Sequence, residues 1–191
     1  MTGRTHDLAA FTALTYIVAT QPLFQMSLGT ALVAFTANMI GGLAPDIDQP
    51  TARIWQDMRF GKAIGKLISP LFGKHRFISH SLIGLVIFGV VLKFLLGIAS
   101  TVVLVDMNVV WWGFMIGFLS HLIMDSFTHD GVPWLFPLPI SFGVPPIKFL
   151  RLKTGGVLEK SIIFPGLILI TFYVFYSHYG KLLDLLRHYI K

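Results

Sequence analysis

Long uncharged stretches separate short polar segments along this chain. No Asp, Glu, Lys or Arg occurs from Leu8 to Pro45, a stretch about twice the ~20 residues that a helix needs to cross a bilayer. Gln21-Pro22 lies near its middle and predicts a tight turn that divides the stretch into two spans. Three further apolar stretches follow. The sequence therefore predicts five membrane-spanning helices, over residues 6–23, 26–44, 79–98, 109–124 and 161–177.

Residues 52–72 show a different pattern, because apolar side chains recur there at near-helical spacing and basic side chains lie opposite them. Arg59, Lys62 and Lys66 form the basic side. This pattern predicts an amphipathic helix that lies in the membrane interface with its cations toward anionic headgroups. The expected fold is an all-α polytopic membrane bundle of about five transmembrane helices plus this cytoplasmic interfacial helix, in a single integral-membrane domain over residues 1–191.

The composition supports a membrane protein and excludes several other classes. Of the 191 residues, 54% are hydrophobic and 13% are charged, with a mean hydropathy of +0.74, whereas about a quarter of the residues in a soluble domain are charged. The absence of Cys excludes a disulfide scaffold and a thiolate metal site. The net charge of +6 indicates membrane topology rather than nucleic-acid binding. We therefore expect membrane lipid, and no nucleic acid, among the partners.

Basic residues gather in two of the predicted loops. Residues 45–78 and 127–160 hold most of the Lys and Arg between the spans, so the positive-inside rule places both loops and the N-terminus in the cytoplasm. Within the second loop, the turn-rich and apolar segment 130–139 predicts a re-entrant or interfacial loop. Lys181 and Arg187 would break the charge pattern if the fifth span crossed fully, and the side of the C-terminal tail stays open.

Histidine and aspartate residues gather at the predicted inner ends of the spans. His121 and Asp125 are four residues apart and project from one helix face, a spacing that suits two ligands of one metal. Asp46 and Asp48 follow a proline, and two close carboxylates repel each other unless a cation or basic group lies between them. Five of the seven histidines belong to this inner set, namely His6, His75, His80, His121 and His129.

Each of these motifs has a simpler explanation when it is taken alone. His121 and Asp125 can form a hydrogen-bonded pair at a helix end, and Asp46 with Asp48 can be a solvated acidic turn. If the helix ends pack together, however, these groups share one pocket. Imidazole and carboxylate ligands without thiolate fit Zn²⁺, Mn²⁺ or Fe²⁺. The number of candidate ligands exceeds one tetrahedral site, so the pattern allows two ions.

These motifs, in this order, resemble the YdjM family of bacterial inner-membrane proteins, which are described as membrane-bound metal-dependent hydrolases. The family usually has Thr-His-Ser where this chain has Ser79-His80-Ser81, and it often has Thr-Pro where this chain has Thr128-His129. The resemblance implies a multi-pass protein of the bacterial inner membrane. It covers nearly the whole chain and is carried by His6, Pro45-Asp46-Ile47-Asp48, His75-Arg76, Ser79-His80-Ser81, Gly117 to Leu122, Asp125 and Glu159.

The family is in turn similar, at a distance, to zinc-dependent phospholipase C and the P1-type nucleases. By that analogy His6, Asp46, His121 and Asp125 look like equivalents of the zinc ligands in those enzymes, and a phosphoester substrate is implied. We therefore expect a metal-dependent hydrolase that acts on a phosphoester or lipid-like substrate at the cytoplasmic face. The alternative is a metal-binding transporter, sensor or structural membrane protein without hydrolase activity.

The expected roles divide into metal binding and substrate chemistry. Asp48 or Glu159 is expected to take a proton from water, and Arg76 to bind an anionic oxygen of the substrate. Asp48 and His75 are expected to be either ligands or residues that hold the ligands in place. The expected catalytic residues are Asp48, His75, Arg76 and Glu159. The expected ligands of a divalent metal, zinc before manganese or iron, are His6, Asp46, Asp48, His75, His80, His121 and Asp125.

Overall fold

A computed structural model describes residues 1–21, 26–56, 58–72 and 76–190. The described residues form no β-strand, and two isolated bridges join Thr128 to Leu152 and Val132 to Phe142. The predicted all-α class is therefore confirmed. In chain order the elements are α1 (Gly3–Thr20), α2 (Leu28–Leu43), η1 (Ala44–Asp48), α3 (Arg53–Gln56), α4 (Gly61–Ile68), η2 (Ser69–Phe72), α5 (Leu82–Ala99), α6 (Met107–Ser126), η3 (Lys148–Leu150), η4 (Glu159–Ile163), α7 (Phe164–Ser177) and α8 (Tyr179–Ile190).

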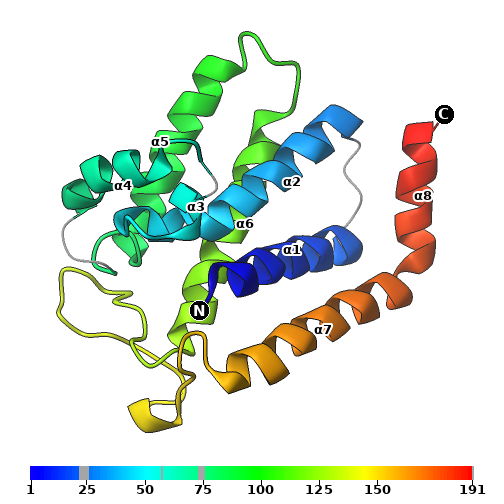
Figure 1. The fold of residues 1–191 in the computed structure, drawn as a ribbon. Coiled ribbons are helices and arrows are strands. Elements are labelled where there is room, and N and C mark those ends of the chain that lie inside the picture. The colour runs from blue at the N-terminus through cyan, green and yellow to red at the C-terminus, as the bar shows by residue number, and fades with distance from the viewer. Residues whose placement is uncertain (22–25, 57, 73–75, 191) are drawn as a thin grey trace.

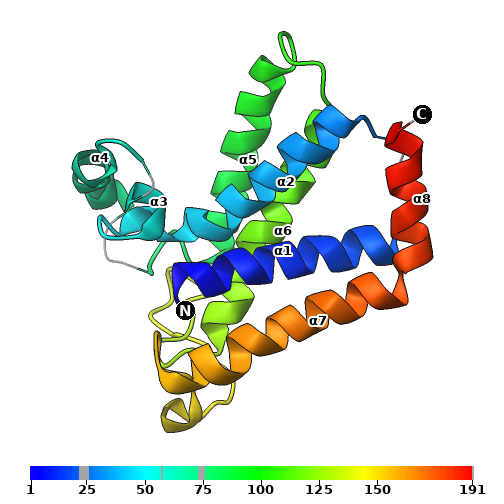
Figure 2. The ribbon, with the colours of Figure 1, turned by 45° about the vertical axis from the view of Figure 1, so that its right-hand side comes forward.

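Four helical segments in the described part of the chain are long and apolar enough to cross a membrane. They are Leu28–Asp48, Leu82–Ala99, Met107–Ser126 and Glu159–Ser177, and they match four of the five predicted spans. The remaining predicted span, residues 6–23, corresponds to α1. This helix has a polar first turn and lies beside α2, α6 and α7 in the bundle (Figures 1 and 2). The predicted count of five spans is therefore approximate.

Small residues allow α2 and α6 to pack closely. A Cβ atom on Gly117 of α6 would lie 2.1 Å from the Asn38 carbonyl oxygen, and one on Gly41 of α2 would lie 2.1 Å from the Phe114 carbonyl oxygen. The buried Asn38 side chain donates a 3.0 Å hydrogen bond to the Gly113 carbonyl. Close backbone contact through glycines is typical of membrane helix pairs. This packing brings the C-terminal end of α2 next to the last turns of α6.

The prediction of one continuous amphipathic helix over residues 52–72 is wrong. The chain instead forms α3, α4 and the short turn η2, because Phe60 adopts a left-handed conformation (φ 64°) that interrupts the helix. Gly61 follows at a close approach, where a Cβ would lie 1.9 Å from the Trp55 carbonyl oxygen. Trp55 is buried and donates to the Ile47 carbonyl, so this apolar side chain supports η1 instead of facing lipid.

The C-terminal helix α8 begins at the end of the bundle opposite the N-terminus (Figure 2). Lys181 donates a 2.8 Å hydrogen bond to the Ala19 carbonyl in the last turn of α1. Thr12 of α1 and Thr171 of α7 form a buried hydrogen bond of 2.8 Å, so α1 and α7 run side by side. Since α7 starts near the first turn of α1 and ends near its last turn, the tail starts on the side away from His6.

Candidate metal centre

Four elements bring five of the predicted ligands together at one end of the bundle. His6 comes from the first turns of α1, Asp46 from η1, His80 from the segment before α5, and His121 with Asp125 from α6. Ser81 caps α5 by accepting a hydrogen bond from the Gly84 amide, which leaves His80 outside that helix. The side chains of the five residues are 1% exposed or less, with the exception of Asp46, which is 20% exposed.

Two imidazole nitrogens and two carboxylate oxygens form a ring. His80 Nε2 lies 3.5 Å from Asp46 Oδ1 and 3.7 Å from Asp125 Oδ2. His121 Nε2 lies 3.7 Å from the same Asp46 oxygen and 3.8 Å from the same Asp125 oxygen. Tetrahedral zinc with bonds of about 2.0–2.2 Å separates neighbouring ligand atoms by roughly 3.3–3.6 Å. These four nitrogen–oxygen separations are close to that range, so a slight contraction would bring each pair to the spacing of neighbouring zinc ligands.

The orientation of His121 leaves a lone pair directed into the ring. Its Nδ1 lies 2.7 Å from the Gly42 carbonyl oxygen and donates to it, so Nε2 is the unprotonated nitrogen. Within the described residues, this buried Nε2 has no hydrogen-bond partner. A buried polar atom without a partner costs about 1–3 kcal/mol. A bound cation would remove that cost, and the backbone contact resembles the outer support that metal-ligating histidines receive.

His6 lies against this ring. Its imidazole stacks on that of His121, with the ring centroids 3.6 Å apart and an angle of 8° between the planes. His6 Nε2 lies 3.3 Å from the second oxygen of Asp125, Oδ1. Among the described residues, two groups of three side chains have candidate ligand atoms within 4.8 Å of one another. One group is His6, Asp46 and His121, and the other is His80, His121 and Asp125.

Asp48 lies behind His80 instead of in the ring. Its Oδ2 accepts hydrogen bonds from Ser79 Oγ at 2.7 Å and from the Arg76 amide at 2.9 Å. Ser79 Oγ in turn lies 3.0 Å from His80 Nδ1. Asp48 therefore fixes the segment that carries His80. Ser79 was not among the predicted site residues, although its place beside His80 in the Ser-His-Ser motif is a signal that could have identified it.

Arg76 is directed inward. Its Nη2 lies 2.7 Å from Asp125 Oδ2, and its Nη1 lies 3.2 Å from Thr128 Oγ1 and 3.4 Å from Asp130 Oδ2. The Arg76 guanidinium thus neutralises the buried Asp125 carboxylate. The sequence had led us to expect Arg76 at a position that binds the substrate. The amino group of Met1 also forms an ion pair with Asp125.

Glu159 connects the start of α7 to the start of α1. Its carboxylate accepts hydrogen bonds from the Thr2 amide, the Thr2 and Thr5 hydroxyls and the Gly155 amide, at 2.6–2.8 Å. This use of both oxygens makes Glu159 a positioning residue in the structure, whereas a proton-accepting role was expected. The predicted site residue His75 lies outside the described residues.

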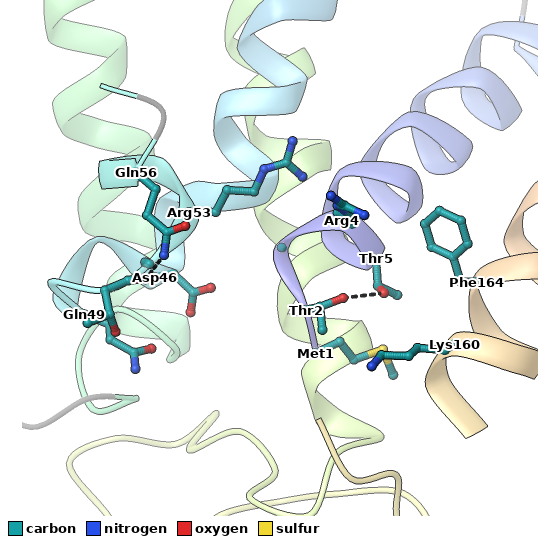
Figure 3. A pocket seen from close by; sticks show the side chains of 13 residues that line it. Met1, Thr2, Arg4, Thr5, Asp46, Gln49, Arg53, Gln56, Lys160 and Phe164 are labelled. Atoms are coloured by element: carbon teal, nitrogen blue, oxygen red, sulfur yellow. Dashed lines mark hydrogen bonds between the residues drawn. The ribbon is translucent and has the colours of Figure 1, made fainter. Parts of the chain in front are cut away.

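A cavity of about 600 Å³ opens beside Asp46 (Figure 3). Its walls come from the start of α1, from the stretch that runs from η1 to α3, and from η4 with the first residue of α7. The lining includes three cations that sequence reasoning did not connect with the site, because they are far apart in the chain. These are Arg4, Arg53 and Lys160.

A helical bundle with several membrane-spanning segments and a buried histidine and aspartate cluster at one end defines a polytopic membrane protein. The chain belongs to the YdjM family, since the family described as YdjM inner membrane protein matches residues 1–182. It is therefore a member of an inner-membrane family with several apolar helices. The orientation of its N-terminus stays a prediction.

Two kinds of curated relatives match the chain. The chain is 33% identical to the uncharacterized protein YvsG of Bacillus subtilis over 179 residues, which cover 92% of this chain and 95% of the relative. It is also 33% identical to the inner membrane protein YdjM of Escherichia coli and of Shigella flexneri over 127 residues, which cover 63% of this chain and 56% of each relative. No solved structure matches the chain. The similarity to phospholipase C and P1 nucleases stays a prediction.

Proposed function

We propose that this protein is a metal-dependent hydrolase that acts on a phosphoester group of an amphiphile at the membrane surface. The observation that carries the proposal is the ring formed by His80, His121, Asp46 and Asp125, which is buried in the bundle and reaches a cavity at Asp46. Asp125 already pairs with Arg76 and with the Met1 amino group, whereas the buried Nε2 of His121 has no hydrogen-bond partner among the described residues, and a bound cation would satisfy it.

The four ring residues would hold one divalent ion, with His6 beside them. Both groups of candidate ligands include His121, and its Nε2 can bind only one ion, so the geometry favours one ion over the two that the ligand number allowed. Zinc suits this donor set, which manganese and iron also accept. When bound, such an ion supplies Lewis-acid polarisation of the phosphoester and activation of water.

The protein's own residues would position that chemistry. The Gly42 carbonyl fixes His121, and Asp48 with Ser79 fixes His80. Asp46 is the ring residue that faces the cavity, where its second oxygen can accept a proton from an attacking water. Asp46 takes the proton-accepting role that was expected of Asp48 or Glu159, because the hydrogen bonds of those two carboxylates hold backbone and side chains in place.

The test is a hydrolysis assay on purified protein in mixed micelles with phosphorylated lipids. Activity should disappear on chelation, return with a divalent metal, and fall at least about a thousandfold in His121→Asn. His178→Asn is the matched control, since His178 lies after α7 at the opposite end. If His121→Asn loses metal and thermal stability while wild type turns over no phosphoester, the ion is structural and the proposal is wrong.

A further inference from the structure

We propose that the cavity beside Asp46 recognises a lipid phosphomonoester, a headgroup with two negative charges; this rests on the proposed function and names its substrate class. The cavity reaches the ring at Asp46. His6, His80, His121 and Asp125 are almost fully buried, and Asp46 is the partly exposed member that also lines the cavity. A substrate bound in this space would therefore lie next to the ring at Asp46, and the volume of about 600 Å³ is typical of ligand sites.

The charges around the cavity favour an anion. Among the described lining residues, Arg4, Arg53 and Lys160 are basic and Asp46 is acidic. Figure 3 shows these residues around one space, with Lys160 across from Asp46. Arg53 also pairs with Asp7, outside the lining, and remains 39% exposed. The basic side chains outnumber the acidic one, so the space carries a positive excess without a metal ion, and an ion on Asp46 would increase it.

The positive excess indicates a phosphomonoester rather than a diester. A monoester carries about −1.5 to −2 charges at pH 7 and offers three acceptor oxygens, whereas a diester carries a single charge. Arg and Lys around such a group form charge-assisted hydrogen bonds, which are about twice as strong as neutral ones. Arg76, by contrast, is committed to Asp125 and lies outside the described lining.

Hydrogen bonds of Glu159 hold the two cationic walls in place. Its carboxylate binds Thr2 and Thr5 on one wall, and the next residue, Lys160, lines the other. Arg4 lies between these two threonines in sequence, so Glu159 fixes the separation of Arg4 and Lys160. This gives a physical role to a buried acid that the proposed chemistry does not use.

The position of the cavity suits an amphiphile. Phe164, the first residue of α7, lines it, and α7 continues with exposed apolar side chains such as Leu169 and Phe172 along a segment long enough to span a membrane. A phosphate in the cavity could thus keep its acyl chains in the bilayer beside α7. In the reaction, the water oxygen bonds to phosphorus as the bond from phosphorus to the lipid oxygen breaks. One water proton ends on the lipid alcohol, and the other stays on inorganic phosphate.

The test measures lipid binding by native mass spectrometry of the full chain, with chelator present so that no metal contributes. Phosphatidic acid and phosphatidylglycerol are the probes, a monoester and a diester with the same acyl chains. Wild type should bind phosphatidic acid about tenfold more tightly than phosphatidylglycerol. The double variant Arg4→Gln/Lys160→Gln should lose about tenfold in affinity for phosphatidic acid, because two charge-assisted contacts are removed.

The matched control is Lys62→Gln/Lys66→Gln, which removes the same charge from exposed positions of α4 outside the described lining. It should leave the affinity within about twofold of wild type. The exposed single variant Lys160→Gln tests the same point if the double variant fails to fold. Equal affinities for the two lipids, or equal losses in the two double variants, would overturn the proposal. Displacement of phosphatidic acid by an equal concentration of glycerol 3-phosphate would overturn the assignment to a lipid.

A third variant separates this inference from the proposed function. His121→Asn should bind phosphatidic acid within about twofold of wild type, because His121 lies outside the described cavity lining. It should not hydrolyse this lipid. Binding that persists without hydrolysis in wild type would contradict the metal-dependent function and leave the headgroup site supported.

Discussion

Helices α5 and α6 have similar lengths and pack against each other, yet they are buried to very different extents. In the apolar window of α5, 11% of the residues are buried, compared with 44% in α6. α5 directs large side chains such as Val90 and Phe94 outward, whereas α6 contacts α1, α2 and α5 and carries His121 and Asp125. A membrane helix can hold polar side chains at a lower free-energy cost where neighbouring helices supply charged or hydrogen-bonding partners. Hydropathy therefore identifies a membrane span, whereas burial by neighbouring helices determines where polar and metal-binding side chains can lie.

The largest expected effect concerns the glycine contacts that enclose α6. Gly117→Ala would place a Cβ 2.1 Å from the Asn38 carbonyl oxygen, so α2 and α6 must separate. We expect a loss of about 3 kcal/mol or more in unfolding free energy, measured by denaturation in detergent micelles. Gly97→Ala on α5 is the control, because nothing lies within 4 Å of the added Cβ. Similar losses in both variants would contradict the difference between the helices.

The second effect is the response to metal removal. At a metal concentration of about 100 times the dissociation constant, binding stabilises the folded state by about 2.7 kcal/mol, and chelation should remove that amount. Hydrogen exchange should then increase at the site end, in residues 117–126 and 79–81, while residues 86–96 of α5 change little. Uniform loss of protection along both helices would show that α5 and α6 do not differ in this respect.

The third effect concerns the support of His80. Ser79→Ala removes the hydroxyl that links Asp48 to His80, while Arg76 still donates to Asp48. Metal affinity should fall about tenfold, as is typical when a residue that orients a ligand is removed. Ser100→Ala is the control, since this exposed serine at the end of α5 bonds only its own helix. A competition titration with a metal-binding dye measures both, and an unchanged affinity in Ser79→Ala would argue against the role of Ser79.

The smallest effect is expected on the outer face of α5. Val90 is 63% exposed, so Val90→Leu changes a side chain on the outer face of α5. The unfolding free energy should change by less than about 0.5 kcal/mol. A thermal melt in the same micelles gives the comparison with Gly117→Ala. A loss of several kcal/mol would show that a partner covers this face.

The sequence alone predicted the helical class, four of the observed spans among the five expected, and the hypothesis that His121, Asp125 and Asp46 share one pocket. These depend on local patterns, namely long uncharged runs and the four-residue spacing on one helix. The break between α3 and α4 was missed, because it depends on the contact between Gly61 and the Trp55 backbone. That contact cannot be read from the amphipathic periodicity of residues 52–72.

The environments of Arg76 and Lys160 also could not be predicted from the sequence. The ion pair of Arg76 with Asp125 joins segments that are far apart in the chain. Lys160 lines the same cavity as Arg4, and the hydrogen bonds of Glu159 to Thr2 and Thr5 join the two walls. Contacts of this kind follow from the packing of helices and leave no local pattern.

Metal content tests the central claim most directly. Protein expressed with zinc, manganese or iron in the medium, and purified without chelator, is analysed by inductively coupled plasma mass spectrometry. The account predicts about one divalent ion per chain in wild type and in His178→Asn, and far less than one in His121→Asn. Wild-type protein that retains none of the three metals, or His121→Asn with full occupancy, would contradict the claim that this ring binds an ion.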